Sequence, residues 1–295
     1  MSPAVSGRSP ASATATAALW MSGAIASFTA MAIAGRAVSL DHDTFELMLY
    51  RSLVGIVVVV AITGLRGQLH SIGHARLGLH TVRNLSHFAG QNLWFYAITV
   101  VPLAQVFALE FTAPLWALVL APIFLSEPIT RARALAALVG FLGILVVTRP
   151  FALPLTPGVL AAALAAIGFA GSAIFTRRLT RTENITTILF WLTAMQAVFG
   201  LVFAGVDGDI ALPTRAALPW LVLIGLAGLL AHLCLTSALR LAPAAVVMPV
   251  DFVRLPLIAV LGFAVYGEPF EAAILLGGAL IIGANWFNLW AEARR

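Results

Sequence analysis

The chain has 295 residues, of which 61% are hydrophobic and only 10% are charged, and its mean hydropathy is +1.00. A soluble domain is about a quarter charged, so this composition excludes a water-soluble globular protein and indicates a polytopic membrane protein. The formal net charge of +5 comes from arginine alone, because the sequence has no lysine, and membrane orientation explains it better than nucleic-acid binding does.

Apolar stretches of roughly 20 residues, the length that crosses a bilayer as a helix, follow one another along the chain. They predict ten spans, at 16–36, 43–65, 79–99, 103–125, 131–149, 157–177, 185–206, 216–239, 243–266 and 271–291. The preceding tail, 1–15, is rich in Ser, Ala and Pro and lacks the pattern of a secretory signal, so we expect it to be disordered. Joints as short as SEP, LAP and GEP leave almost no extramembrane domain.

The arginines indicate the orientation of the spans. Ten spans place both termini on one side, and with the termini in the cytoplasm twelve arginines lie inside against three outside, as the positive-inside rule requires. The inside set is Arg8, Arg66, Arg76, Arg83, Arg131, Arg133, Arg177, Arg178, Arg181, Arg240, Arg294 and Arg295, and the outside set is Arg36, Arg149 and Arg215. We therefore expect both termini in the cytoplasm.

One segment of the chain occurs twice. Residues 97–128 and 238–269 align without a gap at an offset of 141, with nine identical residues in 32, and each copy carries one acid in an apolar run, Glu110 or Asp251. Each repeat then holds five spans, an odd number, so the two repeats must have opposite orientations. We predict an all-α fold of two inverted five-helix repeats, a common plan of secondary transporters, and a duplicated scaffold without transport is the alternative. The predicted repeats are 16–150 and 157–291.

Polar side chains share one face of the predicted span 79–99. They are Asn84, His87, Gln91 and Trp94, at i, i+3, i+7 and i+10. Such a face is costly against lipid, so we expect it to line a cavity or another helix. The matching positions of the second repeat are Gly225, Gly228, His232 and Leu235, where glycine admits a close neighbour or leaves open space. A substrate cavity and plain interhelical hydrogen bonding both explain this pattern.

Asp251 and Arg254 are spaced i, i+3, so their side chains can pair, and each stabilises the charged form of the other. Prolines on both sides of this pair predict a bent or broken helix, which is tolerated at this depth where it lines a cavity. Glu110 has no arginine in its own span, and Arg51 in the span 43–65 is an available partner. Ion pairs that only fix helix register explain these residues equally well.

Glu127-Pro128 and Glu268-Pro269 close the fourth span of each repeat. We expect structural turns there, with a carboxylate and an early proline that help the next helix to start. Trp20 and Trp94 are candidate cavity walls, whereas most other Trp and Tyr residues fit an interfacial belt.

Signatures of catalysis are absent from the sequence. It has no GxxxxGK[ST] loop, no HExxH and no GxSxG, it has a single cysteine, and His70, His74 and His80 form only a loose cluster. We therefore expect no enzyme, no catalytic residue, no metal, no cofactor, and no nucleotide or nucleic-acid partner.

The duplicated five-span unit, the segment FYAITVVPLAQVFALEFTAPLWALVLAPIFLSEPITRARALAALVGFLGILVV and the Glu-Pro turns resemble the EamA repeat of the drug/metabolite transporter superfamily. Arg51 also lies where many such proteins carry an arginine. The resemblance covers the chain after its tail and implies a multi-pass carrier of the bacterial cytoplasmic (inner) membrane. Many members export amino acids, including aromatic ones. The second repeat departs from the pattern, because Trp191 stands at the position that matches Arg51.

We therefore expect a secondary or facilitative exporter of small metabolites, amino acids first, that works by alternating access. Arg254 or Arg51 would meet a substrate carboxylate, and His87, Gln91 and Trp94 would line the chamber. Asp251 or Glu110 would bind an amino group or carry a coupling proton. The alternatives are an exporter of lipophilic drugs or other metabolites, a channel, a membrane scaffold and, last, an intramembrane hydrolase.

Overall fold

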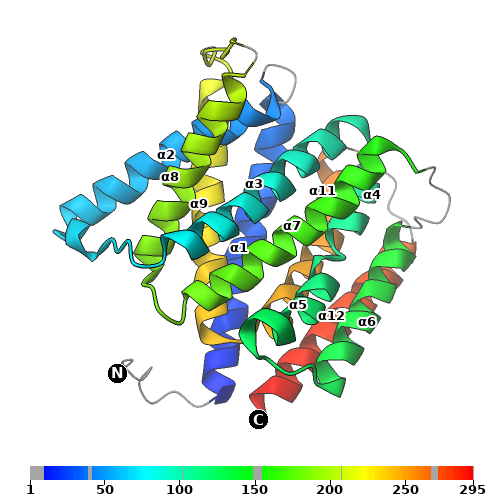
Figure 1. Ribbon diagram of the computed structural model, residues 1–295. Coiled ribbons are helices and arrows are strands. Elements are labelled where there is room, and N and C mark those ends of the chain that lie inside the picture. The colour runs from blue at the N-terminus through cyan, green and yellow to red at the C-terminus, as the bar shows by residue number, and fades with distance from the viewer. Residues whose placement is uncertain are drawn as a thin grey trace.

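A computed structural model describes residues 10–38, 42–101, 103–148, 155–206, 208–266 and 272–294, and within these ranges every regular element is a helix (Figure 1). The elements are α1 (Pro10–Val38), α2 (Thr44–Leu65), η1 (Leu69–Ser71), α3 (Leu77–Val100), α4 (Leu103–Glu110), α5 (Ala113–Leu125), α6 (Arg131–Thr148), α7 (Pro157–Leu179), α8 (Ile185–Ala204), α9 (Leu218–Leu241), α10 (Ala244–Val247), η3 (Met248–Val253), α11 (Arg254–Tyr266) and α12 (Ala272–Ala293). α1 begins inside the segment that we expected to be a disordered tail.

Five of the described helices, α1, α2, α7, α8 and α9, are long and apolar enough to cross a membrane by length and composition. Two predicted spans are interrupted. The span 103–125 consists of α4 and α5, and the span 243–266 consists of α10, η3 and α11. Pro249 lies in the first turn of η3, where its missing N–H is tolerated, and the break predicted from the prolines is confirmed.

Local sequence chemistry explains where several helices begin and end. Asp43 caps α2 through a capping box, because its carboxylate accepts from the backbone of Glu46 while Glu46 accepts from the backbone of Asp43. Thr156, followed by a proline, caps α7 in the same position, and Asn184 caps α8. Ser126 ends α5 with a left-handed φ of 57°. These residues set the short joints between the long helices.

The most extensive helix contacts in the described part of the chain pair helices from the two halves of the sequence. α1 packs on α9, α3 on α7, α2 on α8, and α6 on α12, and α3 and α7 run side by side in Figure 1. Glycines permit the α3–α7 contact, since a methyl group at Gly168 would lie 2.8 Å from the Cα of Gly90. At an offset of 141 the α1–α9 contact corresponds to the α7–α3 contact. The two halves are therefore interlaced.

Arg83 is the clearest departure from the predicted charge distribution. We counted it among the arginines at the cytoplasmic ends of the spans, but it lies in the second turn of α3 with only 1% of its surface exposed. Interhelical neighbours hold it inside the bundle. The positive-inside count therefore placed Arg83 at the cytoplasmic surface, whereas its side chain lies in the interior of the bundle.

Candidate functional site

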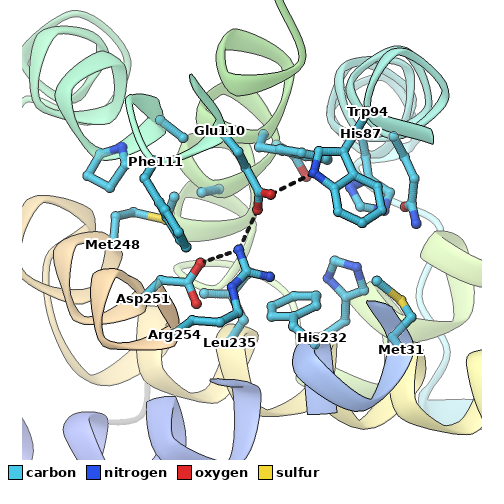
Figure 2. Close-up of a pocket in the computed structure, with 17 residues that line it drawn as sticks. Met31, His87, Trp94, Glu110, Phe111, His232, Leu235, Met248, Asp251 and Arg254 are labelled. Carbon is cyan, nitrogen blue, oxygen red and sulfur yellow. Dashed lines mark hydrogen bonds and ion pairs between the residues drawn. The ribbon is translucent and has the colours of Figure 1, made fainter. Parts of the chain in front are cut away.

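A central cavity of about 90 Å³ lies between α1, α3, α5, α7, α9 and the interrupted segments around Glu110 and Asp251 (Figure 2). Seven predicted site residues line it, namely His87, Gln91, Trp94, Glu110, His232, Asp251 and Arg254. Both halves of the chain contribute to its walls. The cavity is thus built where the repeats meet.

Glu110, Asp251 and Arg254 form an acidic triad at one end of this cavity. Nη2 of Arg254 donates to Glu110 and also to Oδ2 of Asp251, 2.9 Å away, and Trp94 Nε1 donates to the second oxygen of Glu110 at 2.6 Å (Figure 2). The predicted pairing of Asp251 with Arg254 is confirmed. Arg51 as the partner of Glu110 was wrong, because Arg254 from the other repeat occupies that carboxylate. Two acids share one arginine here, which leaves the triad with a net charge of −1 when all three groups are ionised.

Aromatic rings surround the Arg254 guanidinium. Its Cζ lies 5.5 Å from the ring centre of Phe28, 5.7 Å from that of Phe107 and 5.1 Å from that of Phe111, within the range of cation–π attraction. Phe111 also meets Phe252 edge to face, with ring centres 6.0 Å apart. These two phenylalanines are identical positions of the repeat, so the repeats touch each other through matching side chains.

Histidines form the other end of the cavity. The rings of His87 and His232 meet edge to face with centres 4.7 Å apart, and His232 also meets Phe28 at 5.6 Å. Within the described residues, Nε2 of each histidine and Oε1 of Gln91 are buried without a hydrogen-bond partner. Buried polar atoms are nearly always paired, so these three atoms at the cavity are candidates to bond a ligand or water.

Arg83 stands directly behind the histidine end. It donates through Nε to Thr176 Oγ1 at 3.0 Å, through Nη1 to Asn84 Oδ1 at 2.9 Å and through Nη2 to His232 Nδ1 at 3.5 Å. This position was not predicted from the sequence, because an arginine near a span end has the same sequence signal whether it faces the membrane surface or the bundle. The available clue was that Arg83 directly precedes Asn84, the first residue of the polar stripe.

Three predicted site residues do not line the cavity. Trp20 is 38% exposed on the outer side of α1, and Asn84 is buried between α3 and α8, where Gln196 donates to its backbone oxygen at 2.8 Å. Arg51 lies beside a separate space of about 10 Å³ that Ser52, Thr193 and Gln196 also border. The stripe on α3 therefore divides into a part that faces the cavity and a part that bonds to α8.

The glycines that match the stripe serve helix packing. A methyl group at Gly228 would lie 2.8 Å from Nη2 of Arg51, and one at Gly225 would lie 3.1 Å from the backbone oxygen of Arg51. Both glycines admit α2 to the surface of α9, which was one of the two alternatives, and they open no space toward the cavity.

Glu127 connects the two halves at one end of the bundle. Its carboxylate accepts from Arg177 Nε at 2.9 Å, from Arg181 Nη2 at 3.3 Å and from the backbone N–H of Ala244 at 3.3 Å. The first turn of α6 is instead capped by Thr130. Glu127, next to Pro128, therefore does not start α6 as predicted but links the first half of the chain to the second. Glu268 and Pro269 lie outside the described residues.

The remaining lining residues carried no sequence signal. Phe28, Met31, Phe169, Ser172 and Met248 lie in apolar runs where such residues are the ordinary content of a helix. Phe111 was the exception, because it is identical in both repeats. In the described part of the chain no three His, Cys, Asp or Glu side chains are grouped to hold a metal ion.

Interlaced apolar helices around a cavity with buried charges are the architecture expected of a membrane transporter. The chain belongs to the EamA-like transporter family, whose model matches residues 15–149 and 156–290. A riboflavin transporter of Brucella anthropi is 34% identical over 217 residues, which cover 72% of this chain and 76% of the relative. An S-adenosylmethionine uptake transporter of Rickettsia bellii is 26% identical, with 93% of this chain and 94% of the relative covered. The pseudopaline exporter CntI of Pseudomonas aeruginosa is 25% identical, with 87% and 90% covered.

A solved crystal structure shares the fold. It has a TM-score of 0.79 to this chain at 19% sequence identity, and the match covers 95% of this chain and 98% of the other. Membership of a transporter family agrees with the expectation of a multi-pass membrane transporter. The relatives include proteins named for uptake as well as one named as an exporter, and the three described here are not named for amino acids.

Proposed function

We propose that this protein is a secondary or facilitative carrier that moves small metabolites across the bacterial inner membrane by alternating access through the central cavity. The observation that carries the proposal is the cavity itself, where the two repeats meet around buried charges and unpaired polar atoms. Intramembrane charges are costly and usually functional. A cavity between repeats is also the usual substrate site of transporters built from two repeats.

We further propose ten spans in two inverted repeats, with both termini in the cytoplasm. The positive-inside count supports this topology, because moving Arg83 into the bundle still leaves eleven arginines inside against three outside. The interlaced contacts of α1 with α9 and of α3 with α7 exchange under the repeat, as a pseudo-two-fold axis requires. The start of α1 and the end of α12 lie at the same end of the bundle in Figure 1.

The lining of the cavity suits a substrate that joins an apolar or aromatic body to charged groups. Aromatic rings form much of the wall, and the acidic triad supplies acceptors for an amino group or another cation. Amino acids, including aromatic ones, have this chemistry, and so does S-adenosylmethionine, which contains an amino-acid group. Riboflavin has a flat aromatic ring system, as aromatic amino acids do, but it lacks their amino and carboxylate charges. Export is the proposed direction.

Glu110 and Asp251 are the proposed cation or proton sites. Either the substrate amine displaces Arg254 from one of these acids, or one acid takes up a coupling proton when the arginine moves away. In both cases one of the two carboxylates must part from Arg254 during transport, and the other can keep the shared arginine.

Counterflow in proteoliposomes tests the proposal. The panel contains tryptophan, phenylalanine, riboflavin and S-adenosylmethionine, each measured at equal pH and with an imposed pH gradient. We expect saturable exchange of at least one probe, with loss of gradient-driven accumulation in Asp251→Asn or Glu110→Gln and normal exchange in the control Glu183→Gln, which lies in the turn after α7. Linear flux without counterflow indicates a channel, and the absence of flux for every probe contradicts the proposed carrier.

A further inference from the structure

The two ends of the cavity differ in charge, and the difference has a consequence for substrate orientation. At the acidic end, both Glu110 and Asp251 bond to the same nitrogen of Arg254, so this arginine already has more anionic partners than it has positive charge. A substrate carboxylate that approached Arg254 would meet two like charges. Arg254, although it is a cavity arginine, is therefore a poor anion site.

The opposite end holds positive charge without an anionic partner. Arg83 is almost fully buried, and in the described residues it donates hydrogen bonds to three neutral acceptors, Thr176, Asn84 and His232. Arg51 is only 7% exposed, and the one acceptor found for it in the same residues is the sulfur of Met48 at 3.7 Å. A guanidinium keeps its charge in proteins, and a buried charge without a counter-ion is costly. This side of the cavity is thus short of negative charge.

His232 connects that charge to the cavity. The Arg83 guanidinium can only donate, so Nδ1 of His232 accepts and the ring proton belongs on Nε2. Nε2 is buried and has no acceptor among the described residues, while the ring itself lines the cavity. The contact therefore leaves a positioned N–H donor without an acceptor, in a ring that lines the cavity and is backed by the buried positive charge of Arg83.

One aromatic ring separates the two ends. Phe28 lies 5.5 Å from the Arg254 guanidinium and 5.6 Å from the His232 ring, measured from its ring centre. In Figure 2 Arg254 lies between Asp251 and His232. A ligand that covers Phe28 can reach the acids with one group and His232 with another.

We propose that His232, positioned and polarised by Arg83, binds the carboxylate of the substrate while Glu110 and Asp251 face its cationic group. The preferred substrates are then dipolar compounds, with an amino or other cationic group and a carboxylate on the same molecule. Arg83 acts through His232 and is a positioning residue. This assignment rests on the proposed carrier function and adds to it the orientation and the charge class of the substrate.

Matched pairs of probes test the assignment. Tryptophan is compared with tryptamine, and S-adenosylmethionine with its decarboxylated analogue, because each second member lacks only the carboxylate. Dissociation constants come from ligand-dependent thermal shifts of the purified protein, and counterflow inhibition gives the apparent affinity in proteoliposomes. In the wild-type protein we expect the carboxylate to improve binding of at least one pair by about tenfold or more, as a charged hydrogen bond would.

Variants of Arg83 separate positioning from simple structural support. Arg83→Gln should erase the preference for the carboxylate and leave the affinity for tryptamine within about twofold, whereas Arg83→Lys should keep much of the preference. Arg133→Gln is the matched control, since Arg133 is also buried but pairs with Glu292 away from the cavity. It should leave the preference unchanged.

The outcomes are distinct. Equal or tighter binding of the decarboxylated probes by the wild-type protein overturns the assignment and needs no variant. Equal weakening of both members of a pair by Arg83→Gln also overturns it, because a purely structural residue behaves in that way. Flux of decarboxylated probes with no carboxylate preference leaves the carrier function intact, whereas no binding and no flux for any probe, riboflavin included, overturns the carrier function and the assignment with it.

Discussion

The interrupted segments α4–α5 and α10–η3–α11 are copies of one sequence, yet they solve the problem of a buried acid differently. Both are interrupted next to the acid, because α4 ends at Glu110 in the first copy and Asp251 lies within the 3-10 helix η3 in the second. The second copy carries Arg254 one turn after its acid, and the first copy has no arginine of its own. Glu110 therefore takes its counter-charge from the other repeat. Duplication supplied two acids, but the arginine that both of them contact comes from the second repeat alone.

The largest expected effect comes from replacing Arg254, which contacts the acids of both copies. Arg254→Met leaves two buried carboxylates without a cation, and removing one partner of a buried ion pair costs about 3–5 kcal/mol. We expect a strongly lowered melting temperature in detergent and loss of transport. Arg254→Lys should be milder because it keeps the charge.

A triple variant gives the decisive control for this effect. Glu110→Gln, Asp251→Asn and Arg254→Met together remove the charges along with their counter-charge, so the melting temperature should recover most of the loss. If the triple variant melts as low as Arg254→Met, the packing of the arginine against Phe111 and Phe28 is the stabilising contribution, and the shared-charge interpretation is wrong.

A smaller effect should distinguish the two acids. In the described part of the chain Glu110 has two side-chain partners, Arg254 and Trp94, and its side chain is 10% exposed, whereas Asp251 has the arginine alone there and its side chain is 21% exposed. Glu110→Gln should therefore destabilise by about 2 kcal/mol and Asp251→Asn by about 1 kcal/mol. Denaturant unfolding of the two variants measures this difference. Equal losses would mean that the copies are energetically alike despite their different partners.

The smallest effect isolates one hydrogen bond. Trp94→Phe removes the donor to Glu110 and keeps an aromatic ring, so we expect a loss of about 1 kcal/mol. The loss should persist in an Asp251→Asn background and vanish in a Glu110→Met background, because the indole N–H of Trp94 donates to Glu110. A loss that is the same in both backgrounds would assign the effect to packing of the indole.

The sequence predicted those parts of the site that depend on local spacing. The Asp251–Arg254 pair follows from an i, i+3 step, and the cavity position of His87, Gln91 and Trp94 follows from a helical stripe. The stripe also included Asn84, which bonds to α8, since periodicity identifies a face of a helix but not the neighbour that covers each turn. The pairing of Glu110 with Arg254 joins residues 144 positions apart, and spacing along the chain does not encode such a contact.

Arg83 and Phe28 show two other limits of the sequence. An arginine in the second turn of a span has an ordinary explanation at the membrane surface, and that explanation concealed a buried side chain. Phe28 looks like any other apolar residue of a membrane helix, although it contacts both ends of the cavity. The overall plan of apolar helices was easier to predict, because length and hydropathy alone determine it.

The glycine contact between α3 and α7 bears on which parts of the molecule can move as rigid bodies. No side chain cushions the approach of Gly90 and Gly168, so the two backbones interlock and cannot slide without losing close van der Waals contact. α1 and α9 meet in a similarly close way, where a methyl group at Gly23 would lie 2.9 Å from the sulfur of Cys234. The closely packed units of this structure are then α3 with α7 and α1 with α9, each a hybrid of both repeats. The unit that was duplicated in the sequence is therefore not the unit that packs most closely.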